Sequence, residues 1–492
     1  MPPDDRRANI LLIVTDQQRS DTLGCYGAPT CRTPHLDALA ERGVRFSHAY
    51  TATLPCSPAR ASLFTGLYPH KHGVAVNGAM LNPDAPNLAT ELGRAGYNLG
   101  YAGKWHVDQV RVPSDYGFHT KDFPGYGYPA SGIVKGLRFG SAASRATRHY
   151  AQYLHEQGHA PPTVLEACYG DNPGVQSQEM YALQSGGIDT NFESMVSEET
   201  IRLLRHMKVE RERSGAPFFI WANFWGPHTP CLLPEPYYSM YDPHMIPEEP
   251  SFGERWERKP FVQQLYERYW GLSSGGWPSW RRIVARYWGY VTMLDDLIGR
   301  ILTELRTLGL EEQTLVVFTT DHGDMMGAHR LIEKGPFTYE QCYRLPMIAT
   351  HPACTAPGHI CDAFVYLHDL FPTFLDIAGV TSSPAPDGRS ILANILAEEE
   401  PTGRESIYTS FTAQIFPYEQ RMVRTRMHKL VYNRSDMGEL YDLGRDPWEM
   451  ENLIDLPETR TVQGELLALM REHMVQLGDP LLGPFDRIRH VY

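Results

Sequence analysis

Polar side chains with metal-binding and anion-binding chemistry stand where apolar stretches of this chain end. Asp16 and Gln17 follow the apolar run NILLIVT, and Asp321 and His322 follow TLVVFTT. Groups that offer mostly oxygen ligands suit Ca²⁺, Mg²⁺ or Mn²⁺. Five further residues offer positive charge or N–H donors, which suit a tetrahedral oxyanion. They are Arg60, Lys104, His106, His228 and Lys334. The two sets predict a cation site beside an anion site.

Cys56 begins the segment CSPARASLFTG, at the predicted start of a helix. A helix N-terminus and a nearby arginine both lower a thiol pKa, so a nucleophilic thiolate is one interpretation. The tyrosine-phosphatase pattern, Cys followed by five residues and Arg, fails because Ser62 stands at the arginine position. A buried cysteine without chemistry is the other interpretation.

Alternating strands and helices are predicted to position these residues. Residues 9–16 form a continuous apolar run, which is typical of a central parallel strand. Thr33 and Pro34 are predicted to start a helix that Gly43 ends. A long helical pattern over 281–310 then precedes another buried strand. The order predicts an α/β fold with a large, doubly wound, mostly parallel sheet, which binds ligands at the carboxyl ends of its strands.

The chain is predicted to have two domains. Residues 1–385 form the catalytic domain, with long insertions at about 120–190 and 229–275 that are rich in Gly, Pro and Tyr. Residues 386–492 form a smaller α+β domain after a linker near 382–390. In that domain we predict a hairpin over 421–433 and a helix over 439–455.

Composition excludes several classes of protein. The 492 residues are 42% hydrophobic, as in packed globular proteins, and carry a formal charge of −13, which disfavours nucleic-acid binding. No apolar run reaches the roughly 20 residues of a membrane span. The N-terminal run ILLIV ends in Asp16 rather than in a cleavage site, so we expect a cytoplasmic protein without a signal peptide. The eight cysteines show no zinc-ligand spacing.

The motifs taken together resemble those of the formylglycine-dependent sulfatases of the alkaline-phosphatase superfamily. CSPARASLFTG is similar to the family signature, a Cys-x-Pro-x-Arg core with a Leu-x-Thr-Gly tail. Further family blocks appear in the expected order: GKWH, PHTP, TDHGD, EKGPF and ELYDLGRDPWEMENL. The resemblance spans nearly the whole chain. It implies an alkaline-phosphatase-like fold and a sulfuric ester hydrolase that releases an alcohol and sulfate.

The resemblance also explains the cysteine. In this family a maturation enzyme oxidises the motif cysteine to formylglycine (3-oxoalanine), an aldehyde that is hydrated in the resting site. Carried over to Cys56, one hydroxyl of the hydrate attacks sulfur, and the other then loses its proton and expels sulfate. Asp16, Gln17, Asp321 and His322 match the metal-ligand positions, and the Cys56 derivative completes the shell.

The remaining roles follow from the same resemblance. Arg60 holds the hydrated aldehyde, and Lys104 and Lys334 bind the sulfate oxygens of the substrate. His228, together with Lys334, binds and protonates the leaving oxygen. His106 takes the proton whose loss triggers sulfate expulsion.

Gln17 and His322 depart from the family pattern, since many members have Asp and Asn there. The shell is therefore less anionic and softer, so Ca²⁺ is expected first, with Mn²⁺ or Mg²⁺ as alternatives. The same ligands resemble phosphonate monoester and phosphodiester hydrolases, which also use formylglycine but lack the GKWH lysine and histidine, so a sulfatase is favoured. A non-catalytic binding protein is disfavoured because every motif position is filled.

The expected partners are a small-molecule or saccharide sulfate ester and, transiently, a formylglycine-generating maturation enzyme. Neither nucleic acid nor a membrane is expected as a partner. The sequence leaves open the alcohol part of the substrate and the oligomeric state, a homo-oligomer included.

Overall fold

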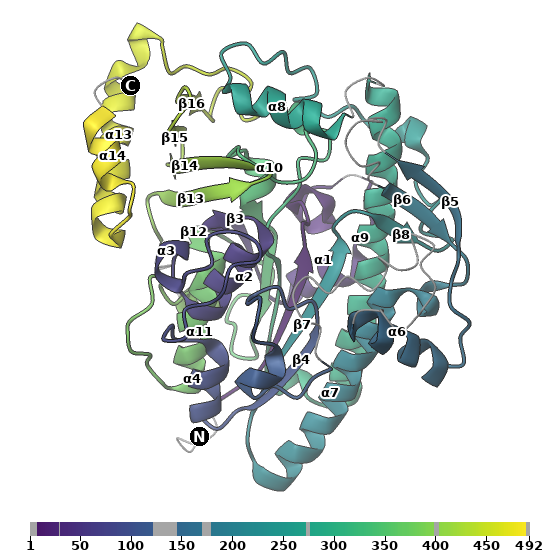
Figure 1. The fold of residues 1–492 in the computed structure, drawn as a ribbon. Coiled ribbons are helices and arrows are strands. Elements are labelled where there is room, and N and C mark those ends of the chain that lie inside the picture. Colours follow the sequence, from purple (N-terminus) through teal and green to yellow (C-terminus); the bar gives the residue numbers. More distant parts are fainter. Residues whose placement is uncertain are drawn as a thin grey trace.

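The computed structural model describes residues 7–28, 30–121, 145–169, 179–271, 276–397 and 403–488. Within them, the strands of the central sheet are β1 (Asn9–Asp16), β2 (Val44–Tyr50), β4 (Asn98–Gly103), β7 (Phe218–Pro227), β9 (Thr314–Thr320), β10 (Arg344–Leu345), β11 (Met347–Thr350) and β12 (His359–Tyr366). They are ordered β10-β2-β11-β9-β1-β7-β4, and β12 pairs with β2 (Figure 1). The sheet is parallel around β1 and antiparallel where β11 joins β9 and β2.

Strand β1 occupies the middle of this sheet, as its apolar sequence predicts. All eight of its residues are buried, and it runs parallel to both β7 and β9. Because parallel strands end at one edge, Asp16 lies beside the end of β9, which Asp321 follows. The sheet therefore brings the two predicted carboxylates together.

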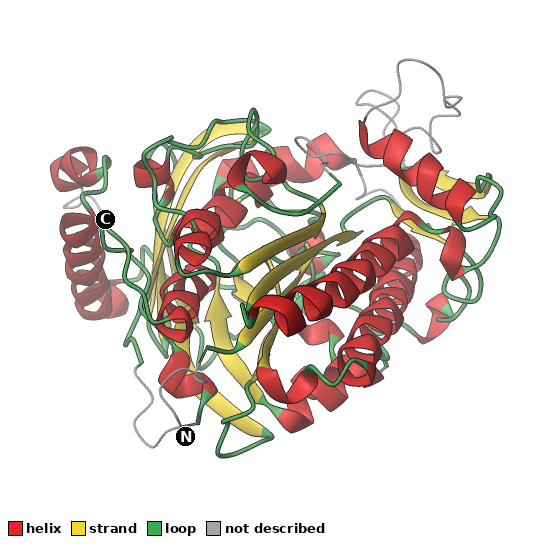
Figure 2. Cartoon of the chain, turned by 90° about the horizontal axis from the view of Figure 1, so that it is seen from below, coloured by secondary structure: helices red, strands yellow, loops and turns green. Residues whose placement is uncertain are grey.

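Helices cover both faces of the sheet (Figure 2). One face packs against α1 (Pro34–Arg42), α7 (Phe192–Ser214) and α9 (Gly276–Thr307), and the other against α2 (Cys56–Thr65), α4 (Leu88–Arg94) and α11 (Leu370–Ala378). Side chains of a strand alternate between faces, so Leu11 and Ile13 join the first core and Ile10, Leu12 and Val14 the second. The predicted doubly wound α/β sheet is confirmed.

The C-terminal part is α+β, also as predicted. Its sheet contains β13 (Ile407–Gln414), β14 (Phe416–Arg424), β15 (His428–Asn433) and β16 (Glu439–Asp442). The fifth strand, β3 (Thr53–Leu54), comes from the N-terminal part of the chain and pairs with β13 in parallel. The sheet is followed by α13 (Arg460–Leu477) and α14 (Leu482–Ile488). The predicted hairpin is β14–β15. The helix predicted over 439–455 is wrong, because the segment pairs as β16 and then turns, and helix begins only at Arg460.

The two segments predicted as insertions contain regular structure. Strands β5 (Val164–Tyr169), β6 (Glu179–Gln184) and β8 (Cys231–Leu233) form a small third sheet, accompanied by α6 (Arg145–Glu156) and α8 (Phe261–Trp270). Parts of the first predicted insertion, 122–144 and 170–178, lie outside the described residues.

Three further helices of four residues each lie outside these insertions: α3 (Pro69–His72), α10 (Glu340–Tyr343) and α12 (Leu392–Ile395).

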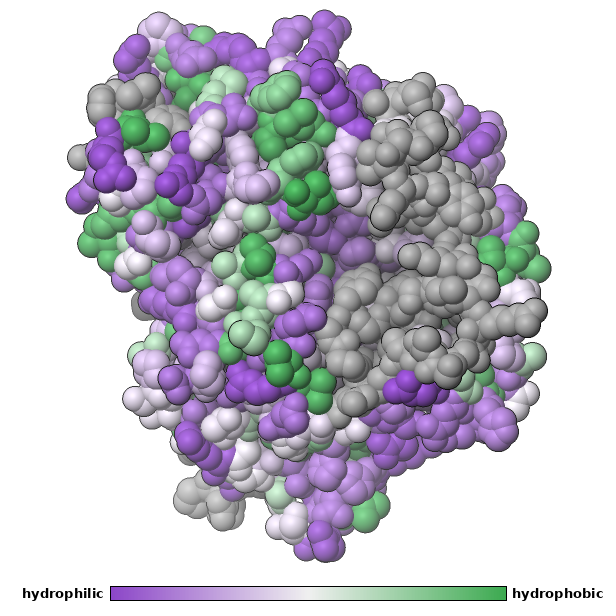
Figure 3. All heavy atoms as spheres, in the orientation of Figure 1, coloured by the Kyte–Doolittle hydropathy of each residue, from purple (hydrophilic) through white to green (hydrophobic). Residues whose placement is uncertain are grey.

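None of the helices in the described part of the chain is both long and apolar enough to cross a bilayer. Hydrophilic and hydrophobic residues are interspersed over the coloured part of the face in Figure 3.

Candidate active site

Cys56 is the first residue of α2, and all ten residues of that helix are buried. At this position the positive end of the helix faces the thiol. The Cys56 Sγ atom lies 3.1 Å from Nε2 of His322 and 3.8 Å from Oδ1 of Asp16. The helix ends at Gly66 with φ 73°, and a Cβ there would lie 2.7 Å from the Phe371 ring, so α2 packs closely against α11 at its C-terminal end. The local fold thus fixes the sulfur atom against the two strand ends.

Arg60 lies one turn further along α2 and joins both carboxylates. Its Nε donates to Oδ2 of Asp321 at 2.8 Å, and its Nη2 donates to Oδ2 of Asp16 at 3.0 Å. Its Nη1 donates to Oδ1 of Asn223, inside β7, at 2.8 Å. The side chains of all three ion-paired residues are fully buried. A buried guanidinium is stable only when it is paired in this way, so Arg60 and the two carboxylates form one structural unit.

Lys104 follows β4 directly and reaches the same carboxylate. Its Nζ donates to Oδ2 of Asp16, and its backbone N–H donates to the carbonyl of Asn223 at 3.0 Å. Gly103 makes this approach possible, because its φ is 93° and a Cβ there would lie 1.8 Å from the same carbonyl. Burial alone would raise the pKa of Asp16, but Lys104 and then Arg60 lower it well below its usual value.

The pKa values of His322 and His106 are shifted in opposite directions, although burial alone would lower both. Burial alone would lower the pKa of His322, but Asp321 and Cys56 raise it to about 9. Its Nδ1 is 2.8 Å from the carbonyl of Gly323, which accepts a hydrogen bond and leaves Nε2 facing Cys56. Burial, followed by the charge of Lys104, lowers the pKa of His106 well below its usual value. His106 also has a positive φ of 51°, which turns the chain after the GKW segment.

Lys334 connects His228 to the rest of the cluster. Its Nζ lies 2.8 Å from Nε2 of His228, 2.6 Å from Oε1 of Gln17 and 2.7 Å from Oε2 of Glu333. The Nδ1 of His228 lies 2.6 Å from the carbonyl of Thr229, which can only accept, so Nδ1 carries the proton and Nε2 accepts from Lys334. Burial and the charge of Lys334 lower the pKa of His228 to about 4.

Glu193, at the start of α7, holds the loop that carries His228. Its carboxylate accepts from the N–H of Gly226 at 2.6 Å, from the N–H of Trp225 at 3.2 Å and from the hydroxyl of Tyr290 at 2.8 Å. A Cβ at Gly226 would lie 2.5 Å from the Tyr290 ring, so only glycine fits there. Burial raises the pKa of Glu193 to about 7, although these hydrogen bonds oppose the rise. The fully buried Glu193 thus anchors the chain two residues before His228.

Four of the predicted residues form a set that fits a metal ion. Ligand atoms of Asp16, Cys56, Asp321 and His322 all lie within 4.8 Å of one another, and all four residues are buried. Two carboxylates and an imidazole suit a divalent cation, and the Cys56 sulfur lies beside them. The amide of Gln17 is hydrogen-bonded to Lys334 and to Asp324.

The structure brings together all the residues that the sequence predicts for the site. Direct contacts join nine of them, and His106 lies within electrostatic reach of Lys104, Asp16, Arg60 and Lys334.

Four participants were not predicted from the sequence. Asp324 is the second acid of TDHGD, and Glu333 precedes Lys334 in EKGPF, so both stood in motifs already noted. Asn223 is a single amide inside an apolar strand, and such a polar residue could have been recognised in the sequence as a candidate site residue. No sequence signal marks Glu193, because its role depends on the contact of α7 with β7.

Comparison with known proteins agrees with this geometry. A family model described as "Sulfatase" matches residues 8–380, and one described as "N-sulphoglucosamine sulphohydrolase, C-terminal" matches residues 327–476. The chain is 30% identical over 484 residues to "Uncharacterized sulfatase YidJ" of Escherichia coli, covering 96% of this chain and 88% of that protein. It is 28% identical over 507 residues to an N-acetylglucosamine-6-O-sulfatase of Bacteroides thetaiotaomicron, covering 96% and 87%. The structure of a phosphonate monoester hydrolase from Silicibacter pomeroyi superposes with a TM-score of 0.76 at 25% identity, covering 96% of each chain.

Proposed function

The chain belongs to the sulfatase family, and we propose that it hydrolyses a sulfate monoester through a formylglycine made from Cys56. It is a sulfuric ester hydrolase of the alkaline-phosphatase superfamily. The observation that carries the proposed mechanism is the position of Cys56. It begins a buried helix, lies against His322 and Asp16, and is followed one turn later by the arginine that pairs with both carboxylates.

Formylglycine at position 56 would supply a nucleophilic hydroxyl and, from its second hydroxyl, an internal route for sulfate release. The site fits this group, because the side chain at 56 is enclosed by Asp16, His322 and Arg60 rather than by apolar side chains alone. The Arg60 guanidinium is rigidly held by two carboxylates and lies beside residue 56. It would therefore orient oxygens there without moving. We infer that a formylglycine-generating maturation enzyme binds the chain transiently, since the Cys-x-Pro-x-Arg motif is complete.

Asp16, Asp321, His322 and the Cys56 derivative would hold a divalent metal, with Gln17 as a further predicted ligand. The metal would supply positive charge to stabilise the negative charge that develops on the attacking and transferred oxygens. Ca²⁺ remains the first candidate because carboxylate oxygens dominate the set. Mn²⁺ is favoured over Mg²⁺ as the alternative, because Mn²⁺ accepts the His322 imidazole more readily.

The basic residues around this centre would bind and protonate the substrate. Lys104 donates to Asp16 and Lys334 donates to Gln17, so their ammonium groups are held at different points of the site and can contact different oxygens of one sulfate group. His228 Nε2 accepts from Lys334 in the structure, so a proton delivered to the leaving oxygen comes from Lys334 directly or through His228. Neutral His106, its pKa lowered by burial, is suited to accept the proton of the second hydroxyl.

A saccharide sulfate is the substrate class we favour. A relative of this chain bears the name N-acetylglucosamine-6-O-sulfatase and matches over nearly the whole chain. The second candidate is a phosphonate monoester or phosphodiester, which the His322 and Gln17 positions and the phosphonate monoester hydrolase similarity support. The division into domains at residue 385 and the cytoplasmic location stay predictions.

The test is turnover by matured protein whose Cys56 peptide has been shown by mass spectrometry to carry formylglycine. Sulfate esters of an aryl alcohol and of several sugars are compared with an aryl phosphonate monoester. We expect kcat/KM to be higher for the sulfates, and higher for a sugar sulfate than for an alkyl sulfate of similar acidity. Preference for the phosphonate would support the second candidate. Unmodified, inactive protein from its native host would instead support a binding function.

A further inference from the structure

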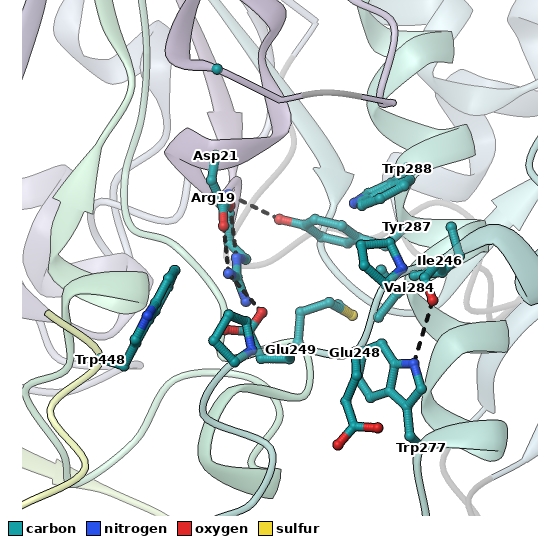
Figure 4. Close-up of a pocket in the computed structure, with 14 residues that line it drawn as sticks. Arg19, Asp21, Ile246, Glu248, Glu249, Trp277, Val284, Tyr287, Trp288 and Trp448 are labelled. Atoms are coloured by element: carbon teal, nitrogen blue, oxygen red, sulfur yellow. Dashed lines mark hydrogen bonds and ion pairs between the residues drawn. The ribbon is translucent and has the colours of Figure 1, made fainter. Parts of the chain in front are cut away.

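A cavity of about 190 Å³ lies on the α9 side of the central sheet, beyond the end of β1 (Figure 4). Its walls come from the loop after β1, residues 246–250, one side of α9, Met326 and Trp448. No residue predicted as catalytic or metal-binding lines it. The cavity is therefore distinct from the candidate active site and has no assigned role.

The charges around the cavity favour a cation. One arginine, Arg19, lines it together with three carboxylates, Asp21, Glu248 and Glu249, so the lining has a formal charge of −2. The Arg19 guanidinium already donates to Asp21 at 2.8 Å, to Glu249 at 3.1 Å and to the Met325 carbonyl at 2.9 Å. Its positive charge is thus compensated within the protein. An anion such as a sulfated sugar would be repelled, and a positively charged ligand attracted.

Aromatic rings form much of the remaining wall. Trp277, Tyr287 and Trp288 project from α9, and Trp448 faces them from the opposite side, across Arg19 and Glu249 (Figure 4). Trp448 is a large hydrophobic side chain that is 42% exposed. Tryptophan and tyrosine faces beside carboxylates are the groups that recognise alkylammonium ions. A neutral sugar would use the rings but not the net charge.

We propose that this cavity binds an organic ammonium ion. Its volume is below the ~300–1,000 Å³ typical of drug-sized ligands, so it accommodates one small group such as a trimethylammonium. The positive head would lie among the rings and near Glu248, whose exposed side chain can approach it from the rim. The ammonium is either a free ligand or part of a substrate.

Occupancy of the cavity has a direct structural route to the active site. The Tyr287 hydroxyl donates to the Gln17 carbonyl at 2.6 Å and accepts from the Arg19 N–H at 3.0 Å. Arg19 is only three residues from Asp16, a separation of at most about 11 Å along the chain. A ligand against the Tyr287 ring therefore contacts the side chain that holds the segment after Asp16.

The test is a titration of the full-length protein with tetramethylammonium chloride. Binding is measured by tryptophan fluorescence and by calorimetry, and NaCl is the ionic-strength control. The uncharged 2,2-dimethylpropan-1-ol serves as a neutral ligand of similar shape. Glu248→Gln and Trp448→Ala each remove one recognition element from an exposed position, so folding is expected to survive. Glu312→Gln, which removes a carboxylate at a different cavity, is the matched control.

We expect saturable binding of tetramethylammonium, weaker binding of the neutral alcohol, and an affinity about 2- to 30-fold lower in Glu248→Gln and Trp448→Ala. Glu312→Gln should bind as the unaltered protein does. Absence of saturable binding overturns the proposal, and so does equal affinity for the neutral alcohol. An equal loss in Glu312→Gln would show a non-specific charge effect and would also overturn it.

A second measurement distinguishes the two sources of the ammonium group, and it alone rests on the proposed sulfatase activity. Tetramethylammonium is added during turnover of a sulfate ester that carries a trimethylammonium group and of its neutral tert-butyl counterpart. If tetramethylammonium competes with the cationic ester but not with the neutral ester, the cavity binds the ammonium group of the substrate. Lack of competition with either ester assigns it to a separate ligand. The binding titration needs no turnover, so failure of the proposed activity and failure of this proposal remain separable.

Discussion

Glu193 offers the sharpest test of how the fold positions His228, the proposed proton donor to the leaving group. In Glu193→Gln, one carboxylate oxygen becomes an NH₂ group of the same shape. If it replaces Oε2, it faces the N–H of Trp225, and the hydrogen bond of 3.2 Å is lost. If it replaces Oε1, the bond from the Gly226 N–H is lost, whereas the Tyr290 hydroxyl can turn to accept from the new NH₂ group. A buried donor that loses its acceptor costs about 1–3 kcal/mol, so we expect the free energy of unfolding to fall by at least about 1 kcal/mol.

The consequence for catalysis should depend on the leaving group. The affected N–H groups lie two and three residues before His228, and a displacement of about 1 Å at a catalytic group can cost about 10²-fold. An alkoxide needs a proton as it departs, whereas a nitrophenolate hardly does. We therefore expect kcat/KM to fall about 10-fold or more for an alkyl or sugar sulfate, and less than about 3-fold for nitrophenyl sulfate.

The assay is kcat/KM of matured protein across sulfate esters of graded leaving-group acidity, with metal content and Tm measured for each variant. Tyr290→Phe removes one of the three donors and should show a smaller effect of the same kind. Glu212→Gln, on the exposed side of the same helix, is the matched control and should change neither quantity. A deficit of equal size for all leaving groups, or a loss of Tm without any change in kcat/KM, would refute the positioning role of Glu193.

Four further predictions concern other groups. Cys56→Ala should fold normally and lose all turnover; substantial activity in a rigorously purified sample would disprove the formylglycine mechanism. Chelation should abolish activity, and Asp321→Ala should lose both metal and turnover, which elemental analysis and kinetics can check; an active metal-free protein would contradict this. His228→Ala should harm sugar or alkyl sulfates far more than nitrophenyl sulfate, while Lys104→Ala should harm both equally; a constant His228→Ala deficit would exclude proton donation. Burial lowers the pKa of His72 to about 3, so its unfolded form takes up a proton first as pH falls. The unaltered protein should therefore lose about 1 kcal/mol more stability than His72→Gln between pH 6 and 5, measured by denaturant unfolding, and parallel curves would refute this.

Much of the fold was predictable because its central elements are unusually apolar. A strand such as β1, buried on both faces, must be a continuous apolar run, and α9 shows the helical period over its whole length. The prediction of a helix over 439–455 was wrong because the spacing of apolar residues in this segment does not distinguish a helix from a strand. There Leu440 and Tyr441 pair with β15, and the following Gly, Asp and Pro residues favour turns.

The sequence by itself determined the chemistry of the site. Cys56, Arg60 and the acids at strand ends are recognisable because their motifs are local, and the parallel sheet brings strand ends to one edge. Only the tertiary structure decided which groups pair. Asp16 and Asp321 have no lysine or arginine partner near them in the sequence, yet Arg60 joins both, and Lys104 reaches Asp16 across the sheet. Such pairing depends on distances of a few ångströms between distant segments. No spacing along a chain encodes it, because those distances arise only when the helices pack on the sheet.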